Sequence, residues 1–104
     1  MPSFAERALL EALPFHVDRL EGRAALARGD ASSALGALTR ARDGFTGLGA
    51  RWDAAVAKLW LAEAQLAAGA PAMRESAEDA LGVFDELRSV RESEQARSLL
   101  SRSE

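Results

Sequence analysis

The chain has 104 residues, of which 48% are hydrophobic and 28% are charged, and its formal net charge is -3. That length suits one domain with one core, and the negative charge leaves no basic field for phosphate contacts, so direct nucleic-acid binding is not expected. The chain contains no cysteine, which excludes a disulfide framework, a thiolate metal site and a cysteine nucleophile.

Capping residues, prolines and glycines mark the ends of the predicted helices. Ser3 and Glu6 form a capping box, in which each side chain accepts a hydrogen bond from the other residue's backbone N–H group, so the first helix begins near Ser3. Pro14 should end this helix, because proline disfavours a helical conformation in its predecessor and has no N–H to donate. Gly29 ends the second helix, and Asp30 caps the third.

The later helices are bounded by the same kinds of residue. The stretch Gly47–Gly49 ends the third helix, and Gly69 ends the fourth. Ser89 and Glu92 form a second capping box before the last helix. The six predicted ranges are 3–13, 15–28, 31–47, 51–68, 71–87 and 90–102. The short connections make consecutive helices antiparallel neighbours, so the sequence predicts an all-α fold in a single domain over residues 1–104.

Two stretches of the chain resemble each other. Residues 20–30 read LEGRAALARGD and residues 60–70 read WLAEAQLAAGA, and FTGL at 45–48 is followed 39 positions later by FDEL at 84–87. Self-similarity at a period of roughly 20 to 50 residues is typical of stacked supersecondary units. The repeat therefore predicts a scaffold that binds another molecule, and not an enzyme.

The repeat carries a resemblance to a known family. At Gly22, Gly29, Ala34, Leu38 and Ala41 the chain resembles the tetratricopeptide repeat (TPR), which has a small residue in its first helix, glycine at the turn, and alanine with a large apolar residue in its second helix. This resemblance implies antiparallel helix-turn-helix repeats stacked in a TPR-like right-handed superhelix.

The period of 39 to 40 residues and the sequence FTGLGA at 45–50 indicate which kind of TPR-like repeat the chain resembles. They are similar to the divergent repeats of large bacterial LuxR-type and related ATP-dependent transcription activators. The likeness implies that the chain is the repeat segment of a larger bacterial transcriptional regulator, contacting a protein or peptide partner or other domains of the same protein. The alternative is a free-standing adaptor that holds a peptide or a helix in its concave groove. No GxxxxGK[ST] loop is present, so no cofactor is expected.

Helical spacing places His16, Arg19 and Arg23 on one side of the helix 15–28. In TPR folds the first helix of each pair lines the concave groove, so the resemblance implies that this side and its equivalents in later repeats face a partner. The candidate partner-binding residues are His16, Arg19, Arg23, Leu59, Trp60, Glu63, Gln95 and Arg102. The alternative is that these are ordinary packing or solvated residues. As the sole histidine, His16 has no spaced ligands for a metal site.

Two further expectations concern apolar residues. We expect Trp52 to be largely buried in the core and Trp60, which takes the repeat position of Leu20, to lie on a contact surface. The helix 3–13 is apolar around much of its circumference, which predicts either a missing neighbouring helix or a homodimer through this end.

No apolar run reaches the ~18 residues of a membrane helix, and the first residues lack a signal-peptide pattern, so we expect a cytoplasmic protein.

Overall fold

A computed structural model describes residues 3–102, which form five α-helices and no strand. The helices are α1 (Phe4–Ala27), α2 (Ala31–Gly47), α3 (Arg51–Ala68), α4 (Met73–Glu86) and α5 (Val90–Arg102). The predicted all-α fold is confirmed, and α2, α3 and α5 have the predicted bounds. Helix α4 begins at Met73, two residues after Pro71, because Pro71 and Ala72 lie in the preceding turn. None of the described helices is both long enough and apolar enough to cross a membrane.

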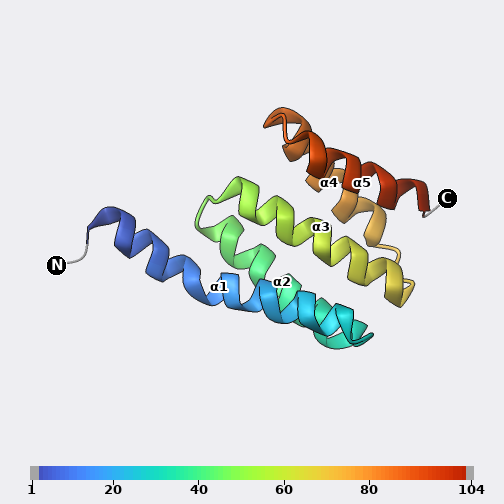
Figure 1. Ribbon diagram of the computed structural model, residues 1–104, viewed down its shortest axis with the longest axis horizontal. Coiled ribbons are helices and arrows are strands. Elements are labelled where there is room, and N and C mark those ends of the chain that lie inside the picture. The colour runs from blue at the N-terminus through green and yellow to red at the C-terminus, as the bar shows by residue number, and fades with distance from the viewer. Residues whose placement is uncertain (1–2, 103–104) are drawn as a thin grey trace.

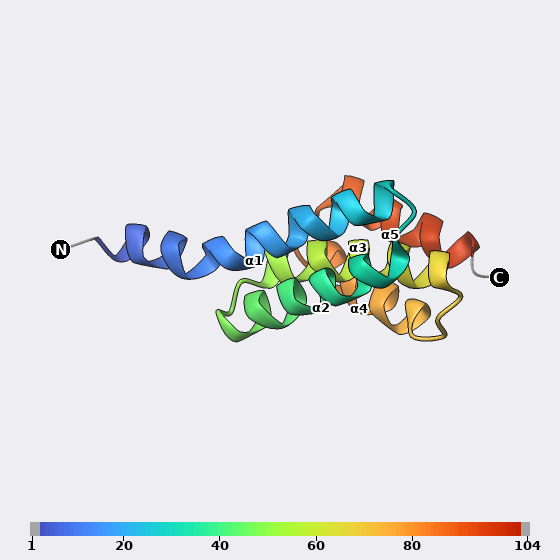
Figure 2. The same cartoon turned by 90° about the horizontal axis from the view of Figure 1, so that it is seen from below.

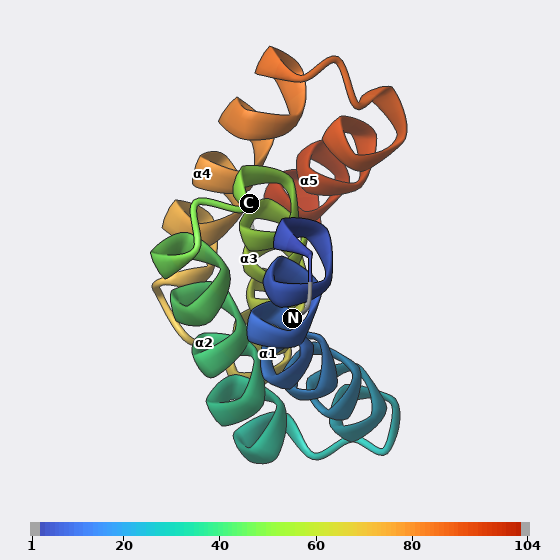
Figure 3. The ribbon, with the colours of Figure 1, turned by 90° about the vertical axis from the view of Figure 1, so that its left-hand side faces the viewer.

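Each helix packs antiparallel against the next along the chain (Figure 1). Helices α2 and α4 lie on one side of the molecule and α1 and α5 on the other (Figures 2 and 3). Helix α3 contacts all four of the other helices. Helices α1, α3 and α5, which carry all the candidate binding residues, therefore share one face of the array.

The predicted break at Pro14 is wrong, because α1 runs without interruption through this residue. A proline inside a helix removes one backbone hydrogen bond, here the bond to the carbonyl of Leu10, and that residue is exposed to water. Directly after Pro14, the ring of Phe15 packs edge-on against Phe45 of α2, with 6.0 Å between the ring centroids. We attribute the continuity of α1 to this anchoring, which holds the second half of the helix against α2, while the first half extends beyond α2 (Figure 2).

The four turns between helices share one hydrogen-bonding pattern. The backbone N–H groups of Asp30, Ala50, Ala70 and Ser89 donate to the carbonyls of Ala25, Phe45, Gln65 and Phe84, at 2.8 to 2.9 Å. The residue before each donor has a positive φ, and it is glycine in the first three turns but Arg88 (φ 58°) in the fourth. This is a Schellman-type ending, in which left-handed backbone lets orphan carbonyls of the helix find donors. The pattern recurs every 20 or 19 residues, so the structural unit is one helix and its turn.

Helices α1 and α2 approach closely at two glycines. A Cβ on Gly22 would lie 2.5 Å from Cγ of Leu38, and a Cβ on Gly44 would lie 2.1 Å from the ring of Phe15. The packing role expected for a small residue at position 22 is thus confirmed. Gly44 lies inside α2 and not in the turn after it, and it admits the Phe15 ring between the two helices.

The core follows the chain from one helix pair to the next. Phe45 and Phe84 are completely buried and lie in separate apolar clusters, the first between α2 and α3 and the second among α3, α4 and α5. A third cluster, around Leu38 and Leu61, joins α1, α2 and α3. Trp60 packs against two of the three clusters and so links the two ends of the array.

Candidate binding surface

Arg19 lies in the middle of the contact between α1, α2 and α3. Its guanidinium carbon is 5.8 Å from the ring centroid of Phe45 and 5.3 Å from that of Trp60. One terminal nitrogen is 3.5 Å from Asp53, and the side chain is only 17% exposed. A cation placed over aromatic rings and beside a carboxylate stabilises the packing of the helices that carry them. The structure thus gives Arg19 a role inside the array.

His16, on the same helix, contacts both Arg19 and Phe45. Its ring lies 4.8 Å from the Phe45 ring, measured between centroids, and its Nδ1 is 3.2 Å from a terminal nitrogen of Arg19. A guanidinium can only donate hydrogen bonds, so Nδ1 of His16 is the acceptor in this contact. His16 is half-buried and directed at its own neighbours.

Arg23 lies one turn further along α1 and reaches toward solvent. Its terminal nitrogen donates to the Glu63 carboxylate at 2.6 Å, and its guanidinium carbon is 5.0 Å from the ring centroid of Trp60. Its side chain is 50% exposed. Arg23 thereby bridges α1 and α3 and forms part of one wall of a hollow on the α1/α3/α5 face.

That hollow has a volume of about 270 Å³ and is bounded by three helices. Helix α1 contributes Arg23, α3 contributes an apolar floor, and α5 contributes polar side chains at the rim. Its lining residues are Arg23, Trp52, Val56, Leu59, Trp60, Arg91, Glu92 and Gln95. A concave patch with apolar and aromatic residues below and a few charged groups around it can hold an apolar anchor side chain of a peptide and pair with its polar neighbours.

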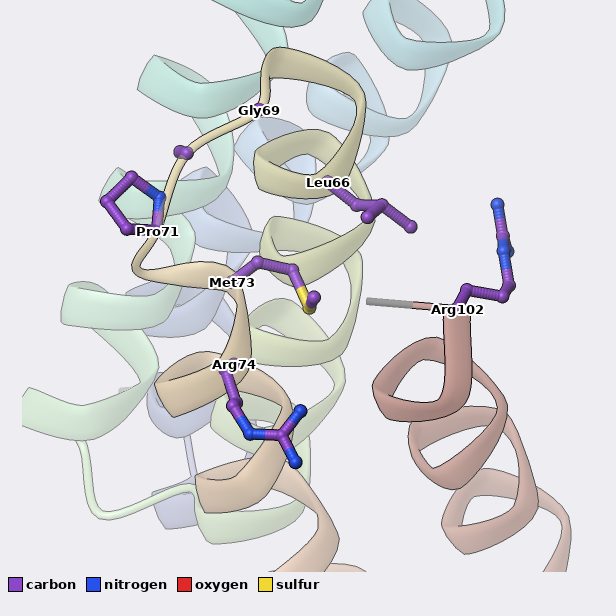
Figure 4. A pocket seen from close by; sticks show the side chains of 7 residues that line it. Leu66, Gly69, Pro71, Met73, Arg74 and Arg102 are labelled. Carbon is purple, nitrogen blue, oxygen red and sulfur yellow. The ribbon is translucent and has the colours of Figure 1, made fainter. Parts of the chain in front are cut away.

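Four of the eight candidate residues line this hollow, namely Arg23, Leu59, Trp60 and Gln95. Glu63 joins them through Arg23, whereas His16 and Arg19 pack beneath the wall. Arg102 lies elsewhere, at the end of α5 across from Leu66 and Met73 (Figure 4). It borders a separate pocket of about 390 Å³ beside the turn between α3 and α4.

The expectation that Trp52 is largely buried is wrong, whereas Trp60 lines the hollow although it is partly buried. Trp52 is 43% exposed, whereas Trp60 is partly buried under Arg19 and Arg23. The guanidinium groups of Arg19 and Arg23 lie over the Trp60 ring, and Trp52 lies one turn before Val56 at the rim of the hollow.

Four lining residues are not among the eight candidates: Trp52, Arg91, Glu92 and Val56. A signal for the first two was present, because Trp52 precedes Val56 by four residues and Arg91 precedes Gln95 by four. Extending each predicted row of residues by one helical turn toward its N-terminus would have found both.

Over residues 3–102, no group of three or more His, Cys, Asp or Glu side chains is placed to hold a metal ion. The fold and this hollow define an all-α array of consecutively packed helices with a concave surface on its α1/α3/α5 face. Comparison with protein-family models, with curated proteins and with solved structures gives no match to this chain.

Proposed function

We propose that the chain is a protein-interaction scaffold of the TPR-like kind, which binds a peptide or a partner helix across the α1/α3/α5 face. The observation that carries this proposal is the half-exposed Trp52 beside the hollow, with Val56 and Leu59 as its apolar floor. Tryptophan is enriched at binding hot spots.

The charged residues at the rim of the hollow support a partner that carries acidic side chains. Arg23 is already paired with Glu63, while the exposed Arg91 stands on the opposite wall next to Glu92. An apolar side chain would enter between Trp52 and Trp60, and a neighbouring carboxylate would meet Arg91 through charge-assisted hydrogen bonds. The proposed partner is therefore a segment with an apolar anchor flanked by Asp or Glu.

The test is a selection of random peptides on phage against the immobilised chain. We expect enrichment of peptides with an apolar residue next to an acidic one, and at least tenfold weaker binding of these peptides to Trp52→Ala and Arg91→Glu. Leu87→Ala serves as the matched control, because Leu87 is 43% exposed, as Trp52 is, but lies at the end of α4. Enrichment of no peptide, or equal binding to all three variants, would contradict the proposal.

Within this function, we propose that the chain is the repeat segment of a bacterial transcriptional regulator, with its partner a protein, a peptide or other domains of the same polypeptide. The support is the resemblance of FTGLGA at 45–50 and of the 39- to 40-residue period to the repeats of LuxR-type activators. Sequencing the native transcript on both sides of the chain tests this. Continuation into nucleotide-binding and helix-turn-helix sequence supports the regulator, and flanking start and stop codons support the free-standing adaptor.

A further inference from the structure

Helix α1 has a second apolar face that no other helix within residues 3–102 covers. It consists of large side chains that are 45% to 61% exposed: Leu10, Leu13, Val17 and Leu20. Ala24 and Ala27 continue the series, and both are exposed. We call these six residues the α1 stripe.

The α1 stripe has the spacing of a helix-pairing seam. Its members are separated by three, four, three, four and three residues, which is the a/d pattern of a heptad repeat. Phe15 and Gly22, the residues through which α1 packs on α2, are seven apart and occupy the f position of the same heptads. The f position lies opposite the a/d seam, so α2 cannot cover the α1 stripe.

The internal repeat shows what such positions do elsewhere in the molecule. Forty residues after Val17 and Ala24 come Ala57 and Ala64 of α3. Both alanines are completely buried, Ala57 in the cluster with Phe45 and Ala64 in the cluster with Leu38, which are residues of α2. The same helical positions on α3 therefore pack against a neighbouring helix, and on α1 they are exposed.

We propose that the α1 stripe binds the α1 stripe of a second copy of this chain, with the two helices antiparallel. In this register Leu13 lies opposite Val17 of the second copy, and Leu10 lies opposite its Leu20. The flanking e positions then bring Arg7 next to Glu21 of the second copy, twice in the symmetric dimer, and both residues are exposed in the single chain. A parallel pairing would instead place Arg23 beside Arg28 of the other copy, and this repulsion selects the antiparallel orientation.

The antiparallel register also accounts for the projecting half of α1. The N-terminal end of α1 extends past α2, and in the dimer it lies along the second half of α1 in the other copy (Figure 2). The α1 stripe shares no residue with the hollow on the α1/α3/α5 face. Dimerisation and peptide binding are therefore separate properties, and either can fail in experiment without the other.

Sedimentation equilibrium of the full chain over a concentration series tests the proposal. We expect a monomer–dimer equilibrium and, for Leu13→Glu, a dissociation constant raised about 100-fold or more, because the leucine is buried twice in the symmetric dimer. Val90→Glu, on α5, is the matched control, since Val90 is 66% exposed and outside the α1 stripe. A monomer at every concentration, or equal weakening by both variants, would overturn the proposal.

A charge exchange tests the register and the identity of the occupant. Arg7→Glu or Glu21→Arg alone should raise the dimer dissociation constant about tenfold, through two like-charge contacts, and the double variant should restore it. Only a second copy in the antiparallel register gives this restoration. Dimerisation that is insensitive to the single changes, or that the double variant fails to recover, would overturn the proposed pairing.

Discussion

Arg23 and Glu63 are separated by 40 positions in the sequence and form an ion pair of 2.6 Å between α1 and α3. They occupy equivalent places in the two copies of the repeat, so the pair joins a position to its own counterpart. Their opposite charges allow two equivalent helices to lie side by side at the rim of the hollow. The contact thereby links the internal repeat of the sequence to the surface on which we propose binding.

Arg19 and Arg23 should differ sharply when each is replaced by glutamate. Arg19→Glu places a carboxylate against Phe45 and Trp60 and next to Asp53, and we expect it to lower the free energy of unfolding by about 2 to 4 kcal/mol. Arg23→Glu should cost less than about 1 kcal/mol, because the Arg23 side chain is half exposed. Urea denaturation followed by circular dichroism measures both, and equal losses would show that Arg19 has no special place in the packing.

Gly44→Ala should destabilise the protein by about 2 kcal/mol, because the new Cβ would overlap the ring of Phe15, which cannot withdraw from between α1 and α2. Gly82→Ala is the control, since a Cβ at this helical position meets nothing within 4 Å. It should stabilise the protein by about 0.5 to 1 kcal/mol through helix propensity. Thermal unfolding of the two variants should therefore shift in opposite directions, and a shift in the same direction would refute the close approach at Gly44.

Arg88→Gly should stabilise the protein by about 0.5 kcal/mol. Arg88 has φ 58° at the turn position that is glycine in the other three turns, and a side chain in this left-handed conformation is strained. Part of the gain is lost because glycine also makes the unfolded chain more flexible. The control Arg88→Ala keeps the strain and should leave the denaturation midpoint nearly unchanged. A midpoint for Arg88→Gly no higher than that of the alanine variant would count against strain at this turn.

Acrylamide quenching of fluorescence should distinguish the two tryptophans. The variant Trp60→Phe keeps only the 43% exposed Trp52 and should show a larger Stern–Volmer constant than Trp52→Phe, in which the remaining Trp60 is covered by two arginines. A peptide bound in the hollow should reduce the quenching of Trp52. The reverse order of the two constants would restore the sequence-based expectation that Trp52 is the core residue.

Asp30 should make the stability of α2 dependent on pH. Hydrogen bonds from the Ser33 side chain and backbone N–H lower the pKa of this capping carboxylate. The pKa of Asp30 in the folded state lies below that in the unfolded state, so its ionised carboxylate stabilises the fold. This stabilisation is complete above about pH 4 and is lost as the pH falls through the folded-state pKa. Asp30→Asn keeps a cap without the charge, so the melting temperatures of the two proteins should converge toward pH 2. A constant difference would exclude the carboxylate as its source.

Local chemistry along the sequence determined most of the helix ends. The capping box of Ser3 and Glu6 forms as predicted, with both hydrogen bonds present, and Asp30 accepts from the Ser33 backbone at the start of α2. Turn glycines and capping side chains act on residues close to them in the chain, so the sequence alone predicts the helix ends that they form. The short connections predicted the antiparallel order of the helices, and the TPR resemblance implied a shared face for Arg23, Leu59 and Gln95.

The tertiary structure decided the points where distant residues compete with local preference. Pro14 should end a helix by its own chemistry, yet α1 continues, with Phe15 anchored on α2 directly after it. Trp60 is the covered tryptophan because Arg19 and Arg23 of α1 lie over its ring, and both arginines are more than 35 residues before Trp60 in the sequence. Helical periodicity gives the direction of a side chain on its own helix, and packing between helices decides whether anything lies in that direction.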